Sequence, residues 1–126
     1  MEHEQLTQAI IGCAFRVHNT MGFGFLESIY ERCLMIELAN VGLQAKSQVP
    51  IQVSYEGEIV GDFIADIVVE DTVILELKSV LNLAVAHEVQ LVNYLTATDK
   101  VVGLLINFGE KKVDVKRKVK DLPPHD

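Results

Sequence analysis

The chain has 126 residues, of which 49% are hydrophobic, and it carries a formal net charge of -7 at pH 7. This length predicts a single domain over residues 1–120 with a real apolar core. The negative charge is unfavourable for nucleic-acid binding, because phosphates are bound largely through Lys and Arg. No apolar run of about 18 residues is present and the acidic N-terminus has no signal-peptide pattern, so we expect a cytoplasmic protein without a membrane segment.

Two helices are predicted at the start of the chain. Residues 4–19 place apolar side chains at helical spacing, and after a glycine-containing break a second helix is expected from about 26 to 41, ending at Gly42. Cys13 and Cys33 fall in these helices and do not form a CxxC pair. We therefore expect buried free thiols, and neither a disulfide nor a zinc site.

Three strands are expected next, as a meander, followed by a crossover helix and two further strands. The spacing of apolar and turn residues predicts the meander strands at 48–55, 59–69 and 73–78 and the helix at 83–98. The last two strands are expected at 101–108 and 113–119, and a flexible tail at 121–126. This order predicts an α/β fold with a mixed central β-sheet flanked by helices.

The hairpin between the second and third strands brings charged residues together. If residues 70–72 form a three-residue turn, Asp66 lies opposite Glu76, and Lys78 follows on the same face. Ile64, Val68 and Ile74 are expected to share that face. The opposite face is then filled by apolar side chains, namely Phe63, Ala65, Ile67, Val69, Val73, Leu75 and Leu77.

Two acids and a lysine on a half-apolar face carry a large desolvation cost unless something pairs with them. A divalent cation between Asp66 and Glu76, with Lys78 beside it, would meet this need. The alternative is a cross-strand ion pair on the exposed face of a hairpin, and the pattern D…ExK alone does not separate the two.

Polar residues on two helices are expected near the same place. Glu27 lies in the first turn of the second helix, where it either reaches the sheet or complements the helix dipole, while Tyr30 is expected in the core. In the third helix His87, Gln90 and Tyr94 follow one stripe, which suggests either an active-site wall or satisfied boundary residues.

Basic residues gather late in the chain. The cluster is either an edge that faces phosphates or a solvated strand edge guarded by lysines, and it consists of Lys111, Lys112, Lys116, Arg117, Lys118 and Lys120.

The string GFLESIY, with Gly24, Glu27 and Tyr30, resembles the signature of the GxxExxY protein family, which belongs to the PD-(D/E)XK nuclease superfamily. The resemblance covers nearly the whole chain, from RVHNTMGFGFLESIYE through DFIADIVVEDTVILELKSV to HEVQLVNYL and GLLINFG. It implies a restriction-endonuclease-like core.

The resemblance also implies roles for single residues. Asp66 and Glu76 would bind Mg²⁺ or Mn²⁺, with the backbone carbonyl of Leu77 completing the protein ligands, and Lys78 would assist the attacking water. The acid of the first core helix would be Glu27. The third helix would supply Gln90 and Tyr94 as a QxxxY element, and Ala65 stands where the superfamily's name has a proline.

The implied function is a metal-dependent nuclease acting on DNA or RNA. One alternative is a non-catalytic regulatory or protein-interaction module that keeps the fold, and another is an enzyme acting on small phosphorylated ligands. A homodimer is also expected, because two-fold dimers are the commonest assemblies and a chain of this size offers little surface to grip a duplex.

Overall fold

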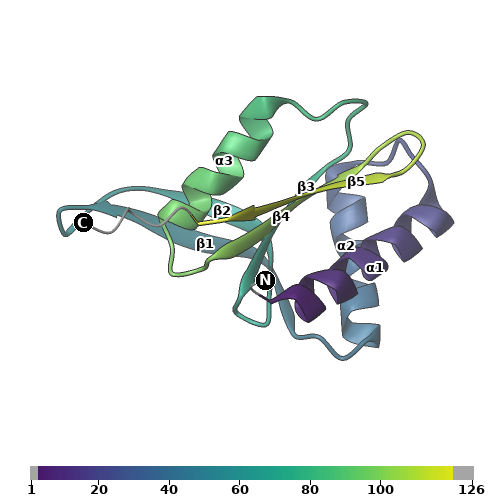
Figure 1. Ribbon diagram of the computed structural model, residues 1–126, viewed down its shortest axis with the longest axis horizontal. Helices are drawn as coiled ribbons and strands as arrows, with labels where there is room; N and C mark the ends of the chain where they lie inside the picture. The colour runs from purple at the N-terminus through teal and green to yellow at the C-terminus, as the bar shows by residue number, and fades with distance from the viewer. Residues whose placement is uncertain (1–2, 121–126) are drawn as a thin grey trace.

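The computed structural model describes residues 3–120, and the predicted tail at 121–126 lies outside this range. Five strands form one sheet in the order β1-β2-β3-β4-β5 (Figure 1). The helices are α1 (Glu4–Met21), α2 (Glu27–Asn40) and α3 (Val85–Thr96), and the strands are β1 (Ala45–Tyr55), β2 (Glu58–Val69), β3 (Val73–Lys78), β4 (Val102–Phe108) and β5 (Val113–Val119).

The sheet is mixed, as the sequence predicts. Strands β1, β2 and β3 form an antiparallel meander, β3 and β4 are parallel and joined through α3, and β5 returns antiparallel to β4. Every residue of β4 is buried, which explains its almost continuous apolar sequence. The expected α/β fold, with its meander and crossover helix, is confirmed.

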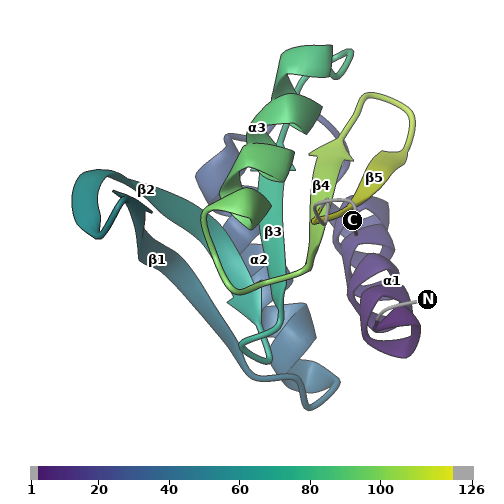
Figure 2. The same cartoon turned by 60° about the vertical axis from the view of Figure 1, so that its left-hand side comes forward.

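Helices cover both faces of the sheet. Helices α1 and α2 pack on one face and α3 on the other (Figure 2), and each side has its own apolar core. Gly103 of β4 lets α3 approach closely, because a Cβ atom there would lie 2.8 Å from Cδ1 of Leu91. Cys13 is buried and Cys33 partly buried, and both are free thiols.

None of the helices between residues 3 and 120 combines the length and the apolar character that crossing a bilayer requires.

The hairpin turn is as predicted, but the pairing beyond it is shorter. Val69 pairs with Val73 across the turn, and the ladder between β2 and β3 ends at Ile67 opposite Leu75. Asp66 lies next to Glu76, as expected, but the two do not form a ladder pair, because β2 separates from β3 at Asp66.

The expected alternation of side chains in β2 is also wrong on the far side of Asp66. Ile67 belongs to the core under α1 and α2, whereas Ala65 belongs to the core under α3, and Phe63 packs against that second core. The same reversal occurs in β1, where Ala45 contacts the first core and Val49 the second. Regular alternation would keep residues an even number apart on one face, so the two-stranded ribbon turns over between these positions.

Candidate active site

Asp66 and Glu76 lie side by side at the point where β2 leaves β3. The Leu77 N–H donates a hydrogen bond of 2.8 Å to Oδ2 of Asp66, and the Asp66 N–H lies 3.4 Å from Oε1 of Glu76. Each acid thus faces a backbone N–H of the other strand. The two carboxyl groups therefore lie together directly beyond the last hydrogen-bonded pair of β2 and β3.

The electrostatics of this pair are dominated by burial and by like charge. Burial and the neighbouring Asp66 carboxylate raise the pKa of Glu76 to about 8, while the charge of Lys78 acts in the opposite direction. Lys78 lies two residues further along β3 and is partly buried. Because β3 alternates regularly, Glu76 and Lys78 share the face that α3 covers.

Tyr94 of α3 reaches the same place. Its ring stacks on Phe63 of β2, with centroids 3.7 Å apart and planes within 7°. Burial, followed by the charges of Glu76 and Asp66, raises the pKa of the Tyr94 phenol. The hydroxyl group therefore lies within electrostatic reach of both acids.

The other two polar residues of the α3 stripe are placed differently. Gln90 is exposed on the helix surface. Nδ1 of His87 accepts a hydrogen bond of 3.2 Å from the Ala84 N–H, so the imidazole caps the start of α3. The stripe thus splits into a capping residue, an exposed amide and a tyrosine beside the acids.

On α2, the carboxylate that the charge of Asp66 influences is that of Glu31. Glu27 is exposed at the first position of the helix, and Glu31 follows one turn later on the same side. Burial raises the pKa of Glu31, a hydrogen bond from Gln48 lowers it, and the charge of Asp66 raises it. Sequence reasoning missed Glu31, although its spacing of four residues from Glu27 would have allowed it to be considered.

Asn107 is a second residue that sequence reasoning missed. It pairs with Lys78 across β3 and β4 and is 2% exposed. Its side chain accepts a hydrogen bond of 2.9 Å from the Val80 N–H and donates one of 2.8 Å to the Val80 carbonyl. Asn107 thereby fixes the chain directly after Lys78, and its signal was a lone amide in an otherwise apolar strand.

Tyr30 lies in the core, as expected. Its ring is fully buried and stacks on Phe108, with centroids 4.4 Å apart. Its hydroxyl donates a hydrogen bond to the Gly22 carbonyl, and Gly24 has a φ of 110°, which favours glycine. These contacts hold the loop between α1 and α2 and set where α2 begins.

The donor atoms at Asp66 and Glu76 suit a hard divalent cation. Between residues 3 and 120, no three His, Cys, Asp or Glu side chains form a ready-made metal-binding group. Mg²⁺, however, is usually held by one or two carboxylates, and waters and substrate oxygens complete its shell. Two adjacent carboxyl groups, whose simultaneous ionisation is opposed by burial and by their like charge, fit that requirement.

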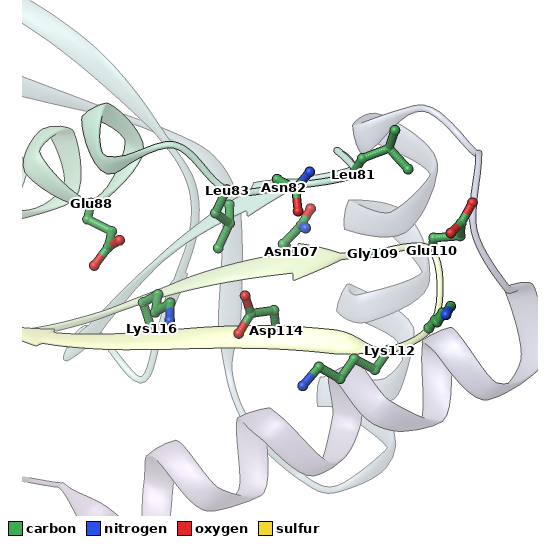
Figure 3. A pocket seen from close by; sticks show the side chains of 11 residues that line it. Leu81, Asn82, Leu83, Glu88, Asn107, Gly109, Glu110, Lys112, Asp114 and Lys116 are labelled. Atoms are coloured by element: carbon green, nitrogen blue, oxygen red, sulfur yellow. The ribbon is translucent and has the colours of Figure 1, made fainter.

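The late basic residues contribute to a separate cavity of about 620 Å³ between residues 81–83, the start of α3 and the β4–β5 hairpin (Figure 3). Its lining alternates in sign, with Lys112 and Lys116 next to Asp114. Glu88 of α3 also lines it and forms an ion pair of 2.7 Å with Lys118. The three candidate catalytic residues of β2 and β3 do not line this cavity.

Comparisons with known proteins identify relatives of this chain. A family model described as the PD-(D/E)XK nuclease superfamily matches residues 4–118. Among solved structures, the crystal structure of SSO0001 is similar, with a TM-score of 0.61 and 18% sequence identity over 76% of this chain and 50% of that chain. The chain thus spans half the length of that protein, and the likeness shows the fold. No curated protein matches the chain.

Proposed function

The chain belongs to the PD-(D/E)XK nuclease superfamily, and from this premise we propose that it is a metal-dependent nuclease that hydrolyses phosphodiester bonds of DNA or RNA. The observation that supports this proposal most is the meeting of Asp66 and Glu76 at the edge of β3, with Lys78 two residues away. The five-stranded mixed sheet flanked by helices is consistent with a restriction-endonuclease-like core.

Asp66 and Glu76 would hold Mg²⁺ or Mn²⁺ through carboxylate oxygens, and the Leu77 carbonyl would be the third protein ligand. The Leu77 N–H is directed at Asp66. Because the N–H and C=O of one strand residue point to the same side, the Leu77 carbonyl is directed to the same edge of β3. This supports the assignment of Leu77.

When bound, the cation would acidify a water molecule and offset the charge of the scissile phosphate. The ammonium group of Lys78 would place positive charge beside the phosphate oxygens as negative charge develops in the transition state. The Tyr94 hydroxyl, close to both acids, would donate a hydrogen bond to a phosphate oxygen. Stacking on Phe63 keeps the Tyr94 ring in one orientation.

Glu27 and Gln90 stay predictions. In this proposal Glu27 would hold a second ion or a water molecule, and Gln90 would orient a water or contact a phosphate. Both side chains are exposed, so each would act only with the substrate in place. Membership of the GxxExxY family is proposed as well, on the strength of Gly24, Glu27 and Tyr30.

The decisive experiment measures cleavage and metal binding in the same variants. We expect the purified protein to cleave at least one of single-stranded, duplex or branched DNA and RNA with Mn²⁺ or Mg²⁺. Lys78→Ala should lower the cleavage rate by about 100-fold or more. Its affinity for Mn²⁺ should stay near that of the wild type, because the carboxylates hold the ion. Lys46→Ala, an exposed lysine of β1, is the matched control.

Undiminished cleavage in both Lys78→Ala and Glu76→Ala would reject the mechanism and identify a contaminating nuclease. Binding of Mn²⁺ without cleavage of any of these substrates would favour the alternative of a non-catalytic module. The proposed homodimer is tested by the mass of the protein in sedimentation or light scattering.

A further inference from the structure

A single residue interrupts the pairing of β1 with β2, directly opposite Asp66. The pairs Ser47–Ile67 and Val49–Ala65 are both formed and keep the same register, but Gln48 and Asp66 between them do not pair. No residue is inserted or deleted in either strand at this point. The interruption is therefore a change of backbone conformation and not a shift of register.

The interruption coincides with an unusual backbone conformation at Gln48, which has a φ of 53°. A residue other than glycine rarely adopts this left-handed conformation, and inside a strand it reverses the direction of the following side chains. Both strands change faces on either side of this position. The outer part of the β1–β2 hairpin then projects beyond α2 (Figures 1 and 2).

Helix α2 holds the side chain of this residue. Nε2 of Gln48 donates a hydrogen bond of 2.8 Å to Oε1 of Glu31. Glu31 in turn lies close enough to Asp66 for the two carboxylates to interact. Gln48 is thus held by α2 at the position where both strands change faces.

The interrupted pairing changes the surroundings of Asp66. Freed from β1, Asp66 is also beyond the last pair of β2 with β3. Its Oδ2 atom instead accepts the Leu77 N–H at 2.8 Å, where a regular antiparallel ladder would place a backbone carbonyl. In a regular strand pair the Asp66 side chain would stand perpendicular to the sheet, away from this N–H.

We propose that Gln48, held by Glu31, is the positioning residue for Asp66. Its left-handed backbone turns β2 so that the Asp66 carboxylate lies at the edge of β3 beside Glu76. The effect on metal binding rests on the proposed function, in which Asp66 is a ligand of the cation. The positioning itself is a property of the metal-free protein and is measurable without any cation.

The test uses substitutions that separate the backbone of Gln48 from its side chain. Gln48→Gly loses the hydrogen bond to Glu31, but glycine adopts the left-handed conformation without strain and does not need to be held in it. The β-branched side chain of Gln48→Val disfavours that conformation. Glu31→Gln keeps an oxygen that accepts the Gln48 hydrogen bond, and Glu31→Leu removes it. Gln48→Gly and Glu31→Gln are therefore the matched controls for the two disruptive variants.

Two quantities are measured, namely hydrogen exchange of the Leu77 amide without metal, followed by NMR, and the dissociation constant for Mn²⁺. Gln48→Val and Glu31→Leu should both speed Leu77 exchange. They should also weaken Mn²⁺ binding by about 10-fold or more, the range seen when outer partners of metal ligands are lost. Gln48→Gly and Glu31→Gln should stay close to the wild type in both. The Leu105 amide, in the buried strand β4, serves as an internal reference.

Unchanged Leu77 exchange in Gln48→Val would overturn the proposal. If that variant does not fold, Glu31→Leu and Gln48→Gly decide, and equal acceleration in both would overturn it as well. A wild type that binds no Mn²⁺, but whose Leu77 exchange depends on Gln48 as described, would support the positioning and contradict the nuclease. The two failures are thus distinguishable.

Discussion

At the scale of single residues, Glu76 separates the two interpretations that the sequence left open. In a simple ion pair with Lys78, the lysine would dominate and hold the pKa of Glu76 below its ordinary value. Burial and the Asp66 carboxylate act more strongly, and the pKa of Glu76 rises to about 8. Without a cation the folded protein therefore keeps a proton on Glu76 at neutral pH, and a divalent ion that displaced this proton would offset the charge of both carboxylates.

The same shift predicts how stability depends on pH. The pKa of Glu76 is about 8 in the folded protein and near 4.5 when the chain is unfolded, so the folded state binds the proton more tightly. Its contribution to stability is present below pH 4.5 and is lost as the pH rises toward 8. In EDTA, Glu76→Gln should raise the free energy of unfolding by about 1 to 3 kcal/mol at pH 8.5.

At pH 5 the substitution should have little effect, since Glu76 is then protonated in the folded protein. Thermal melts at both pH values measure the difference, and Glu58→Gln, an exposed carboxylate in β2, is the control. An equal change in melting temperature at pH 5 and pH 8.5 would show that ionisation of Glu76 does not destabilise the folded protein.

At the scale of elements, the sequence predicts the helices and strands well because each carries its own periodicity. Helical spacing predicts Tyr30 in the core, and alternation about a turn predicts the pair Val69–Val73, and both are found. The faces of Phe63 and Ala65 were not predictable in this way. Alternation assumes an unbroken strand, and the left-handed φ of Gln48, in the other strand, breaks it.

In the candidate site, too, some positions follow from local rules and others only from tertiary packing. Asp66, Glu76 and Lys78 come from one hairpin, so local rules bring them close. Glu31 meets Asp66 only through the packing of α2 against β1, a contact between residues far apart in the sequence. A single sequence offers no measure of that packing, and Glu27 matched the known motif where Glu31 did not.

Strand β5 carries a lysine on the same face as the candidate site. Lys116 pairs with Leu105, which pairs with Glu76, so Lys116 lies two strands from Glu76, about 10 Å away at the usual strand spacing. It is exposed and lines the cavity of Figure 3. We expect it to contact a phosphate of the bound nucleic acid.

Lys116→Ala should weaken nucleic-acid binding for all sequences alike and reduce the slope of log affinity against log salt by about 1. Fluorescence anisotropy across a salt series measures both. Lys46→Ala, on the strand at the opposite edge of the sheet, should leave the slope unchanged. If both substitutions lower the slope equally, nucleic acid does not bind preferentially along the β5 edge.

At the scale of the whole molecule, the charge is distributed unevenly. Six of the 11 lysines and arginines lie between residues 111 and 120, on or beside β5, although the net charge is -7. The tip of the β1–β2 hairpin carries Glu56, Glu58 and Asp62. A polyanion should therefore be attracted to the β5 edge of the sheet and repelled from the hairpin, which would give the proposed nucleic-acid substrate a direction of approach.

The metal-free protein should also be stabilised as a whole by the cation that its site would bind. A ligand that binds only the folded state adds about 2.7 kcal/mol to the free energy of unfolding at 100 times its dissociation constant. Mn²⁺ should therefore raise the melting temperature of the wild type at constant ionic strength, and Asp66→Ala should abolish most of that shift. Asp62→Ala, an exposed acid of the same strand, should retain it. Equal shifts in all three proteins would mean that Mn²⁺ acts through the general acidity of the chain, and the site at Asp66 and Glu76 would then hold an ion pair instead of a metal.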